Sequence, residues 1–164
     1  MTESRQKVFD VLERLGIQVE WEEHPPVFTI DEMDDLGISG RGCVVKNLFL
    51  RDAKGKRHFL VVLAKDKQAD LKGLQERIGC SKLSFASEDR LKKHLDLTKG
   101  AVTPLGVINN EDRTVEVILD GDLVGQNRLG VHPNDNMATL WIAYEDLLKL
   151  IKDHGNPVTI LDEL

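Results

Sequence analysis

Residues 44–64 read VVKNLFLRDAKGKRHFLVVLA. Two apolar runs, 44–51 and 58–64, flank the polar, glycine-containing segment 52–56, and this pattern predicts a β-hairpin. Side chains alternate between the two faces of a strand, so Lys46 and Asn47 each interrupt a largely apolar stripe. A lysine is rarely buried without a partner. Lys46 is therefore either a cationic donor at the end of a pocket or a lysine whose ammonium reaches solvent at the start of the strand.

The sequence on both sides of this hairpin predicts further helices and strands. Helical spacing is found at 4–15, 31–36 and 69–78, in a segment capped by Ser87 that carries Leu91 and Leu95, and in a segment that carries Leu147, Leu148 and Ile151. Strands are expected at 17–21, 82–85, 137–143 and 158–161, and a second hairpin from 105–109 and 114–119. Because hairpins and helices are mixed, we expect an α/β (α+β) fold with a mixed, mainly antiparallel sheet in one domain, 1–164.

Composition excludes several classes of protein. The 164 residues are 41% hydrophobic and 30% charged, as in an ordinary globular domain. No apolar run is long enough to span a membrane, and no apolar signal follows the N-terminus, so we expect a cytoplasmic protein with no membrane partner. Cys43 and Cys80 are too few for a disulfide scaffold. Nucleotide-cofactor motifs, a serine-hydrolase elbow and metal-ligand spacings are missing, so neither a cofactor nor a metal is expected.

Charge is segregated along the chain. The net charge is −6, yet residues 38–100 hold fifteen Lys and Arg against seven Asp and Glu, a net of +8, which leaves −14 for the remainder. A basic block of this kind could meet a polyanion over a limited footprint. The alternative is a solvated surface on which the charges interleave once the chain is folded. Charge alone does not separate these two interpretations.

Three loops carry further candidate chemistry. Gly100, in the segment 99–104, can take a positive φ and let the loop offer backbone N–H groups to an oxyanion, although an ordinary connection explains it as well. The segment 131–139 places His132 among short polar side chains that could bind sugar hydroxyls or order a water, or only satisfy their own turns. In 24–29 two prolines stiffen an apolar segment that could wall a small pocket, and His24 itself is interpreted as structural.

Taken in order, these segments resemble a known family. His24-Pro-Pro-Val-Phe-Thr29, Lys46-Asn-Leu-Phe-Leu-Arg-Asp52, Leu83-Ser-Phe-Ala-Ser-Glu88, Gly100-Ala-Val-Thr-Pro104 and the set His132-Pro133, Asn136 and Thr139 together resemble the YbaK/ProX family of prolyl-tRNA synthetase-associated editing domains. The resemblance runs from about residue 5 to 152 and is strongest to the free-standing ProX branch. It implies a barrel-like sheet flanked by helices. It also implies hydrolysis of the ester that joins alanine, mistakenly attached in place of proline, to the terminal adenosine of tRNA(Pro).

The same resemblance implies roles for individual residues. Lys46 would be the essential lysine that holds the terminal nucleotide or polarises the ester, Gly100 would begin the oxyanion loop, and His132 would contact the adenosine or the aminoacyl group. The substrate-binding residues would be Val27, Phe28, Thr29, Asn47, Ala101, Val102, Thr103, Pro104, Asn136 and Thr139. The attack would come from a ribose hydroxyl and a bound water. Segments 42–45 and 125–131 depart from the family pattern, which leaves the amino-acid preference open.

The implied partners are the acceptor end of tRNA(Pro) carrying alanine and, as a further candidate, prolyl-tRNA synthetase. Two alternatives stay open at this point. One is a deacylase of Cys-tRNA(Pro), and the other is a non-catalytic tRNA-binding or regulatory module on the same fold. The sequence does not indicate an oligomeric state.

Overall fold

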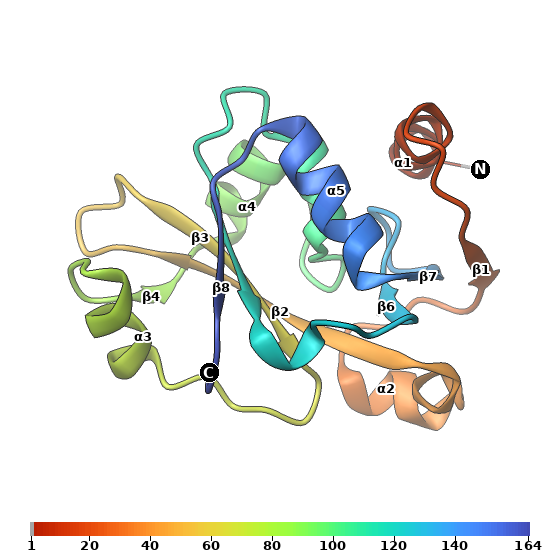
Figure 1. Ribbon diagram of the computed structural model, residues 1–164, viewed down its shortest axis with the longest axis horizontal. Helices are drawn as coiled ribbons and strands as arrows, with labels where there is room; N and C mark the ends of the chain where they lie inside the picture. The colour runs from red at the N-terminus through yellow and green to blue at the C-terminus, as the bar shows by residue number, and fades with distance from the viewer. Residues whose placement is uncertain (1) are drawn as a thin grey trace.

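The computed structural model describes residues 2–164, which form a mixed sheet with helices on both faces (Figure 1). The helices are α1 (Glu3–Arg14), α2 (Ile30–Asp35), α3 (Leu71–Ile78), α4 (Glu88–Leu95) and α5 (Tyr144–His154), with 3-10 helices η1 (Ile38–Arg41), η2 (Pro104–Asn109) and η3 (Gly121–Leu123). The strands are β1 (Glu20–Glu23), β2 (Cys43–Arg51), β3 (His58–Ala64), β4 (Ser84–Phe85), β5 (Glu116–Asp120), β6 (Leu129–Val131), β7 (Ala138–Ile142) and β8 (Val158–Leu161). None of the helices described in this range combines the length and apolar character needed to cross a bilayer.

The hairpin predicted at 44–64 is confirmed as β2 and β3, which pair antiparallel with Lys46 opposite Leu63 and Asn47 opposite Val62. The sheet has the order β1-β7-β6-β2-β3-β5-β8. The pairs β1–β7, β6–β7, β2–β3 and β2–β4 are antiparallel, and β2–β6, β3–β5 and β5–β8 are parallel. The mixed α/β architecture predicted from the sequence is therefore confirmed.

Apolar side chains on both faces of the β2–β3 hairpin are buried, because helices cover both faces. Val45 and Phe49 of β2 face a large core that includes side chains of α4 and α5, whereas Leu50 faces a second core with Leu74 of α3. A third, smaller cluster joins Met33 of α2 to the start of β2. Figure 1 shows the same division, with α4 and α5 on one side of the hairpin and α2 and α3 on the other.

The second edge of β2 is shared by two short strands. β6 pairs with its beginning, at Cys43 and Val44, and β4 pairs with its end, at Leu50 and Arg51. No strand pairs with the stretch between them on this edge in the described part of the chain. Lys46 and Asn47 lie in this unpaired stretch, so the sheet is interrupted beside the two polar residues that the sequence singles out.

The second hairpin predicted from the sequence is wrong. Residues 105–109 lie in η2, a 3-10 helix, and β5 pairs in parallel with β3 and β8 instead of with a strand from this segment. The physical reason is local. Pro104 occupies the first turn of η2, and the Thr103 hydroxyl accepts a hydrogen bond from the Leu105 N–H, which caps the helix. Apolar content alone did not distinguish this buried helix from a strand.

Candidate active site

Four segments far apart in the sequence meet at the interruption beside β2 and enclose a cavity of about 260 Å³. This is slightly below the roughly 300 Å³ at which sites for drug-sized ligands begin, so the cavity suits a small group. The segments are the loop before α2 with α2 itself, the first half of β2, the loop 98–103, and β6 with the residue that follows it. The lining residues are Val27, Phe28, Thr29, Ile30, Met33, Val44, Val45, Lys46, Asn47, Gly100, Val102, Gly130, Val131 and His132.

Lys46 brings a positive charge that no carboxylate neutralises directly. Its Nζ donates to the backbone carbonyl of Lys67 at 3.0 Å, and it forms no ion pair within residues 2–164. An ammonium has three protons to donate. Lys67 itself is neutralised by Asp120 and Asp122, each with an oxygen 2.8 Å from its Nζ. The Lys67 carbonyl therefore orients Lys46 while leaving its charge and two donors available to a ligand.

Asn47 points to the opposite side of β2 and carries an unpaired acceptor. Its Nδ2 donates to the Val102 carbonyl at 3.1 Å, which ties the loop 98–103 to the open edge of the strand. Its Oδ1 is buried and accepts no hydrogen bond within residues 2–164. A buried acceptor without a donor is unfavourable. Its place in a cavity wall makes it a candidate to receive a donor from a ligand.

The loop that contains Gly100 closes against Phe28. Gly100 has φ +86°, and a Cβ at this position would lie 2.5 Å from Cδ1 of Phe28, so both the backbone and the packing call for glycine. The Ala101 N–H already donates to the Thr98 carbonyl. The N–H groups of Gly100 and Val102 have no acceptor within the described residues. These two amides, rather than that of Ala101, are the ones the loop can offer to an oxyanion.

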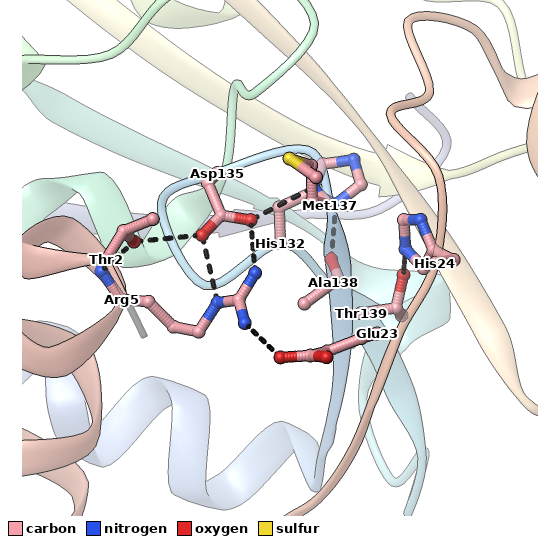
Figure 2. Close-up of polar contacts among 9 residues, drawn as sticks. All are labelled: Thr2, Arg5, Glu23, His24, His132, Asp135, Met137, Ala138 and Thr139. Carbon is pink, nitrogen blue, oxygen red and sulfur yellow. Dashed lines mark hydrogen bonds and ion pairs between the residues drawn. The ribbon is translucent and has the colours of Figure 1, made fainter.

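His132 is held as a neutral ring with one nitrogen free. Its Nδ1 lies 2.9 Å from the Ala138 carbonyl, which can only accept, so Nδ1 carries the proton and Nε2 is an acceptor (Figure 2). Burial, reinforced by the nearby His24, lowers the pKa of His132 below its ordinary value. The two rings lie 6.2 Å apart, and His24 Nε2 is 2.8 Å from the fully buried Thr139 hydroxyl.

Helix α1 is anchored to the loop that carries His132. Arg5 donates two hydrogen bonds to Asp135, at 2.9 and 3.0 Å, and one to Glu23, at 2.9 Å (Figure 2). Burial alone would raise the pKa of Asp135, but hydrogen bonds from Arg5 and from the Met137 N–H bring it below its ordinary value. Arg5 is only 4% exposed. A charged, bidentate contact thus determines where the segment 132–137 lies relative to α1 and β1.

Comparison with known proteins identifies the family. Residues 24–150 match the model of the aminoacyl-tRNA editing domain. The chain belongs to this family. It is therefore an aminoacyl-tRNA editing enzyme, a deacylase, which confirms the family membership and the general class of activity that the ordered motifs predicted.

Relatives of the editing domain share its full extent. The prolyl-tRNA editing protein ProX of Acetoanaerobium sticklandii is 54% identical over 94% of each chain. Prolyl-tRNA synthetase associated domain-containing protein 1 of Danio rerio is 36% identical over 96% of this chain and 86% of that one. A crystal structure of a candidate trans-editing enzyme for prolyl tRNA synthetase, 23% identical, superposes with a TM-score of 0.74 over 100% of this chain and 99% of that one, which shows a shared fold.

The structure of the editing domain divides the predicted site residues into two groups. Those that line the cavity are Val27, Phe28, Thr29, Lys46, Asn47, Gly100, Val102 and His132. Those that lie behind its wall are Ala101, Thr103, Pro104, Asn136 and Thr139, where they hold the lining in place. For example, the Thr103 hydroxyl donates to the His132 carbonyl at 2.7 Å, and Asn136 Nδ2 donates to the Val27 carbonyl at 2.9 Å.

Sequence reasoning missed part of the editing domain's site. Met33 and Gly130 line the cavity, and His24, which the sequence suggests is only structural, lies beside His132. The motif around Pro25 and Pro26 was the available signal for His24. Nothing in the sequence indicated Gly130, because its three-residue strand is too short to show a periodicity.

The basic block keeps much of its charge on the folded editing domain. Of its fifteen Lys and Arg residues, five form ion pairs within residues 2–164: Arg41, Arg57, Lys65, Lys67 and Lys92. The other ten, Lys46 and Lys99 among them, do not. Ion pairs with acidic side chains therefore neutralise only part of the positive charge of segment 38–100. This favours the interpretation that the segment meets a polyanion. The described residues contain no group of three or more His, Cys, Asp or Glu side chains that could hold a metal ion.

Proposed function

We propose that this enzyme hydrolyses the ester of alanine on tRNA(Pro), acting on the free aminoacyl-tRNA in the cytoplasm within a single catalytic domain, 1–164. The observation that carries the proposal is the meeting of the Lys46 ammonium, the free Gly100 and Val102 amides and the neutral His132 ring in one small cavity. The relative from Acetoanaerobium sticklandii, a prolyl-tRNA editing protein, supports the choice of tRNA.

Each group has a task in ester hydrolysis. Attack on the ester carbonyl places negative charge on its oxygen, and the Lys46 ammonium with the Gly100 and Val102 N–H groups stabilises that charge. His132 Nε2 accepts a hydrogen bond from the attacking water, whose proton is finally transferred to the departing ribose 3′-oxygen. The Asn47 amide orients the substrate, and its unpaired Oδ1 accepts a hydrogen bond from the α-amino group or a ribose hydroxyl.

The size of the cavity gives the selectivity. A synthetase pocket built for proline rejects alanine by only about 1–3 kcal/mol, because a smaller side chain loses contacts without clashing. A second, smaller pocket selects in the opposite direction, because it admits the smaller side chain and excludes the larger one. Val27, Met33 and Val44 are buried in the wall of the cavity and leave little freedom for a ring to enter. We expect this wall to accept the alanine side chain and to resist the larger proline ring.

The test measures loss of the amino acid from tRNA(Pro) charged separately with alanine, cysteine and proline. We expect rapid loss of alanine and retention of proline. Lys46→Ala should lower the rate about 100-fold or more, as expected for loss of an oxyanion donor. Lys54→Ala removes an exposed lysine from the β2–β3 turn and serves as the matched control with unchanged activity.

Three outcomes would contradict the proposal. Preferential loss of cysteine would assign the enzyme to Cys-tRNA(Pro). A folded Lys46→Ala variant with full activity would remove Lys46 from catalysis. Binding of tRNA(Pro) without hydrolysis of any of the three esters would favour a non-catalytic module. Addition of prolyl-tRNA synthetase to the same assay tests it as a partner, because a complex would raise the rate at limiting enzyme.

A further inference from the structure

A second cavity of about 380 Å³ lies beside the first along the open edge of β2. Its lining residues are Asn47, Leu48, Phe49, Phe85, Ala86, Ser87, Glu88, Leu91, Lys99 and Val102. Asn47 and Val102 line both cavities, and the hydrogen bond between them, 3.1 Å from Nδ2 to the carbonyl oxygen, forms the partition. Two further cavities, one beside Arg57 and Glu116 and one beside Arg128, share no lining residue with the first.

The second cavity combines an aromatic face with charged groups. Phe85 belongs to the two-residue strand β4, lines the cavity and is 64% exposed, so its ring is accessible to a ligand. Lys99 precedes Gly100 and forms no ion pair within residues 2–164. Glu88, at the start of α4, supplies a carboxylate on the same lining. An open ring, a cation and a carboxylate match a nucleotide, which offers a base to stack, a phosphate, and on cytosine or adenine an exocyclic amine.

We propose that this second cavity binds the nucleotide that precedes the terminal adenosine of the tRNA, with its base stacked on Phe85 and its phosphate beside Lys99. The inference rests on the proposed function, which puts the ester that joins alanine to the terminal adenosine in the first cavity. The 3′ end of a tRNA is single-stranded and ends in two cytidines and an adenosine. The base before the adenosine must therefore lie next to the first cavity, and the second cavity is the neighbour that shares its wall.

The cytosine edge also suits the remaining side chains. A carboxylate can accept a hydrogen bond from the N4 amine of cytosine, and Glu88 is placed to do so. The Ser87 hydroxyl is already engaged, since it accepts from the Arg90 N–H as the cap of α4. Glu88 supplies the charged acceptor on this rim, and it is the group we assign to the base.

The experiment compares two small esters, 3′-O-alanyl-adenosine and the alanyl ester of the dinucleotide cytidylyl-adenosine. The wild-type enzyme should prefer the dinucleotide, because stacking of one base on an aromatic ring contributes about 1–3 kcal/mol, or roughly tenfold in kcat/KM. Phe85→Leu should abolish this preference while leaving hydrolysis of the adenosine ester unchanged. Phe85→Tyr, which keeps the ring, should retain it. Lys99→Ala should lower only the rate with the dinucleotide.

Two variants outside both cavities provide matched controls. Ile160→Ala truncates an apolar residue of β8 that is 46% exposed, and Lys152→Ala removes an exposed lysine of α5. Neither should change the ratio of the two rates. Equal loss with both esters in Phe85→Leu, or no loss with either, would overturn the assignment of Phe85.

A binding measurement separates this inference from the proposed function. The deacylated trinucleotide cytidylyl-cytidylyl-adenosine is titrated into the enzyme, and chemical shifts of Phe85 and Lys99 are followed by NMR. Shifts at both residues in the wild type, with the Lys99 shift lost in Phe85→Leu, support the subsite even if no ester is hydrolysed. Hydrolysis of Ala-tRNA(Pro) with no response at Phe85 would leave the proposed function standing and refute the subsite.

Discussion

At the scale of single residues, Lys46 shows how a charge can be oriented without being neutralised. A carbonyl oxygen, that of Lys67, accepts its hydrogen bond, and the carboxylates nearby are bound to the Lys67 side chain instead. An ion pair in this place would lower the attraction of the ammonium for an oxyanion or a phosphate. The arrangement explains why a lysine occupies a strand position that alternation alone assigns to an apolar residue.

His58 is a buried histidine whose charge the fold suppresses. Burial, then the neighbouring His94 and Arg90, lower its pKa from 6.5 to about 4. In the unfolded chain His58 takes up a proton below pH 6.5, but in the folded enzyme it does so only near pH 4. The unfolded state therefore binds more protons between these values, and the free energy of unfolding falls as the pH falls through this window.

We predict that His58 alone lowers the free energy of unfolding by about 1–2 kcal/mol between pH 7 and pH 5. In His58→Gln, whose amide oxygen can still accept a hydrogen bond from Arg90, this contribution should disappear. Urea unfolding of both proteins at the two pH values measures the difference. The same substitution at His154 is the control, and an equal pH dependence in wild type and His58→Gln would contradict the prediction.

At the scale of elements, α1 acts on the site through one contact. The family match begins at residue 24, so α1 lies outside it, yet Arg5 reaches Asp135 in the loop that follows His132 (Figure 2). The guanidinium also lies 5.5 Å from the ring of Trp21, in β1. The position of the His132 loop therefore depends on a helix 130 residues away in the sequence.

We predict that Arg5→Met lowers the free energy of unfolding by about 2 kcal/mol, less than the full cost of an unpaired buried charge because Asp135 retains some exposure. Arg14→Met is the matched control on the same helix. Arg14 pairs with Asp153 at the surface, where such pairs contribute about 0–1 kcal/mol, so this variant should resemble the wild type. Urea unfolding measures both, and equal effects would show that α1 is not anchored through Arg5.

At the scale of the whole molecule, opposite charges are separated along the chain. The segment 38–100 forms β2, β3, α3, β4 and α4, and it contributes Lys46 to the first cavity and Lys99 to the second. The rest of the chain is acidic. We therefore expect the positive charge of this segment to attract a nucleic acid toward the two cavities and the acidic remainder to repel it.

We predict that kcat/KM for aminoacyl-tRNA falls steeply with salt. Three phosphate contacts to a single strand correspond to a slope of about −2 in log–log form, or about 16-fold between 50 and 200 mM salt. Hydrolysis of 3′-O-alanyl-adenosine, which has no phosphate, should stay constant and serves as the control. Rates for tRNA that do not change with salt would exclude phosphate contacts from recognition.

Much of this protein was predictable from short-range patterns. The alternation in 44–51 and 58–64 predicts the hairpin, and the interruption of that alternation singles out Lys46 and Asn47. The ordered motifs predict the family and most of the cavity lining. These inferences succeed because strand periodicity, turn residues and caps depend on neighbours a few positions away.

Tertiary structure alone decided the rest. The sequence by itself determined the β2–β3 hairpin and the residue types that the site offers. The open edge of β2 exists because β4 and β6, strands of two and three residues, pair with its opposite ends, and strands this short carry no periodicity from which their pairing could be predicted. Likewise, the contact of His24 with Thr139 spans 115 residues. Which distant segments meet depends on how the whole core packs, and local periodicity does not encode that.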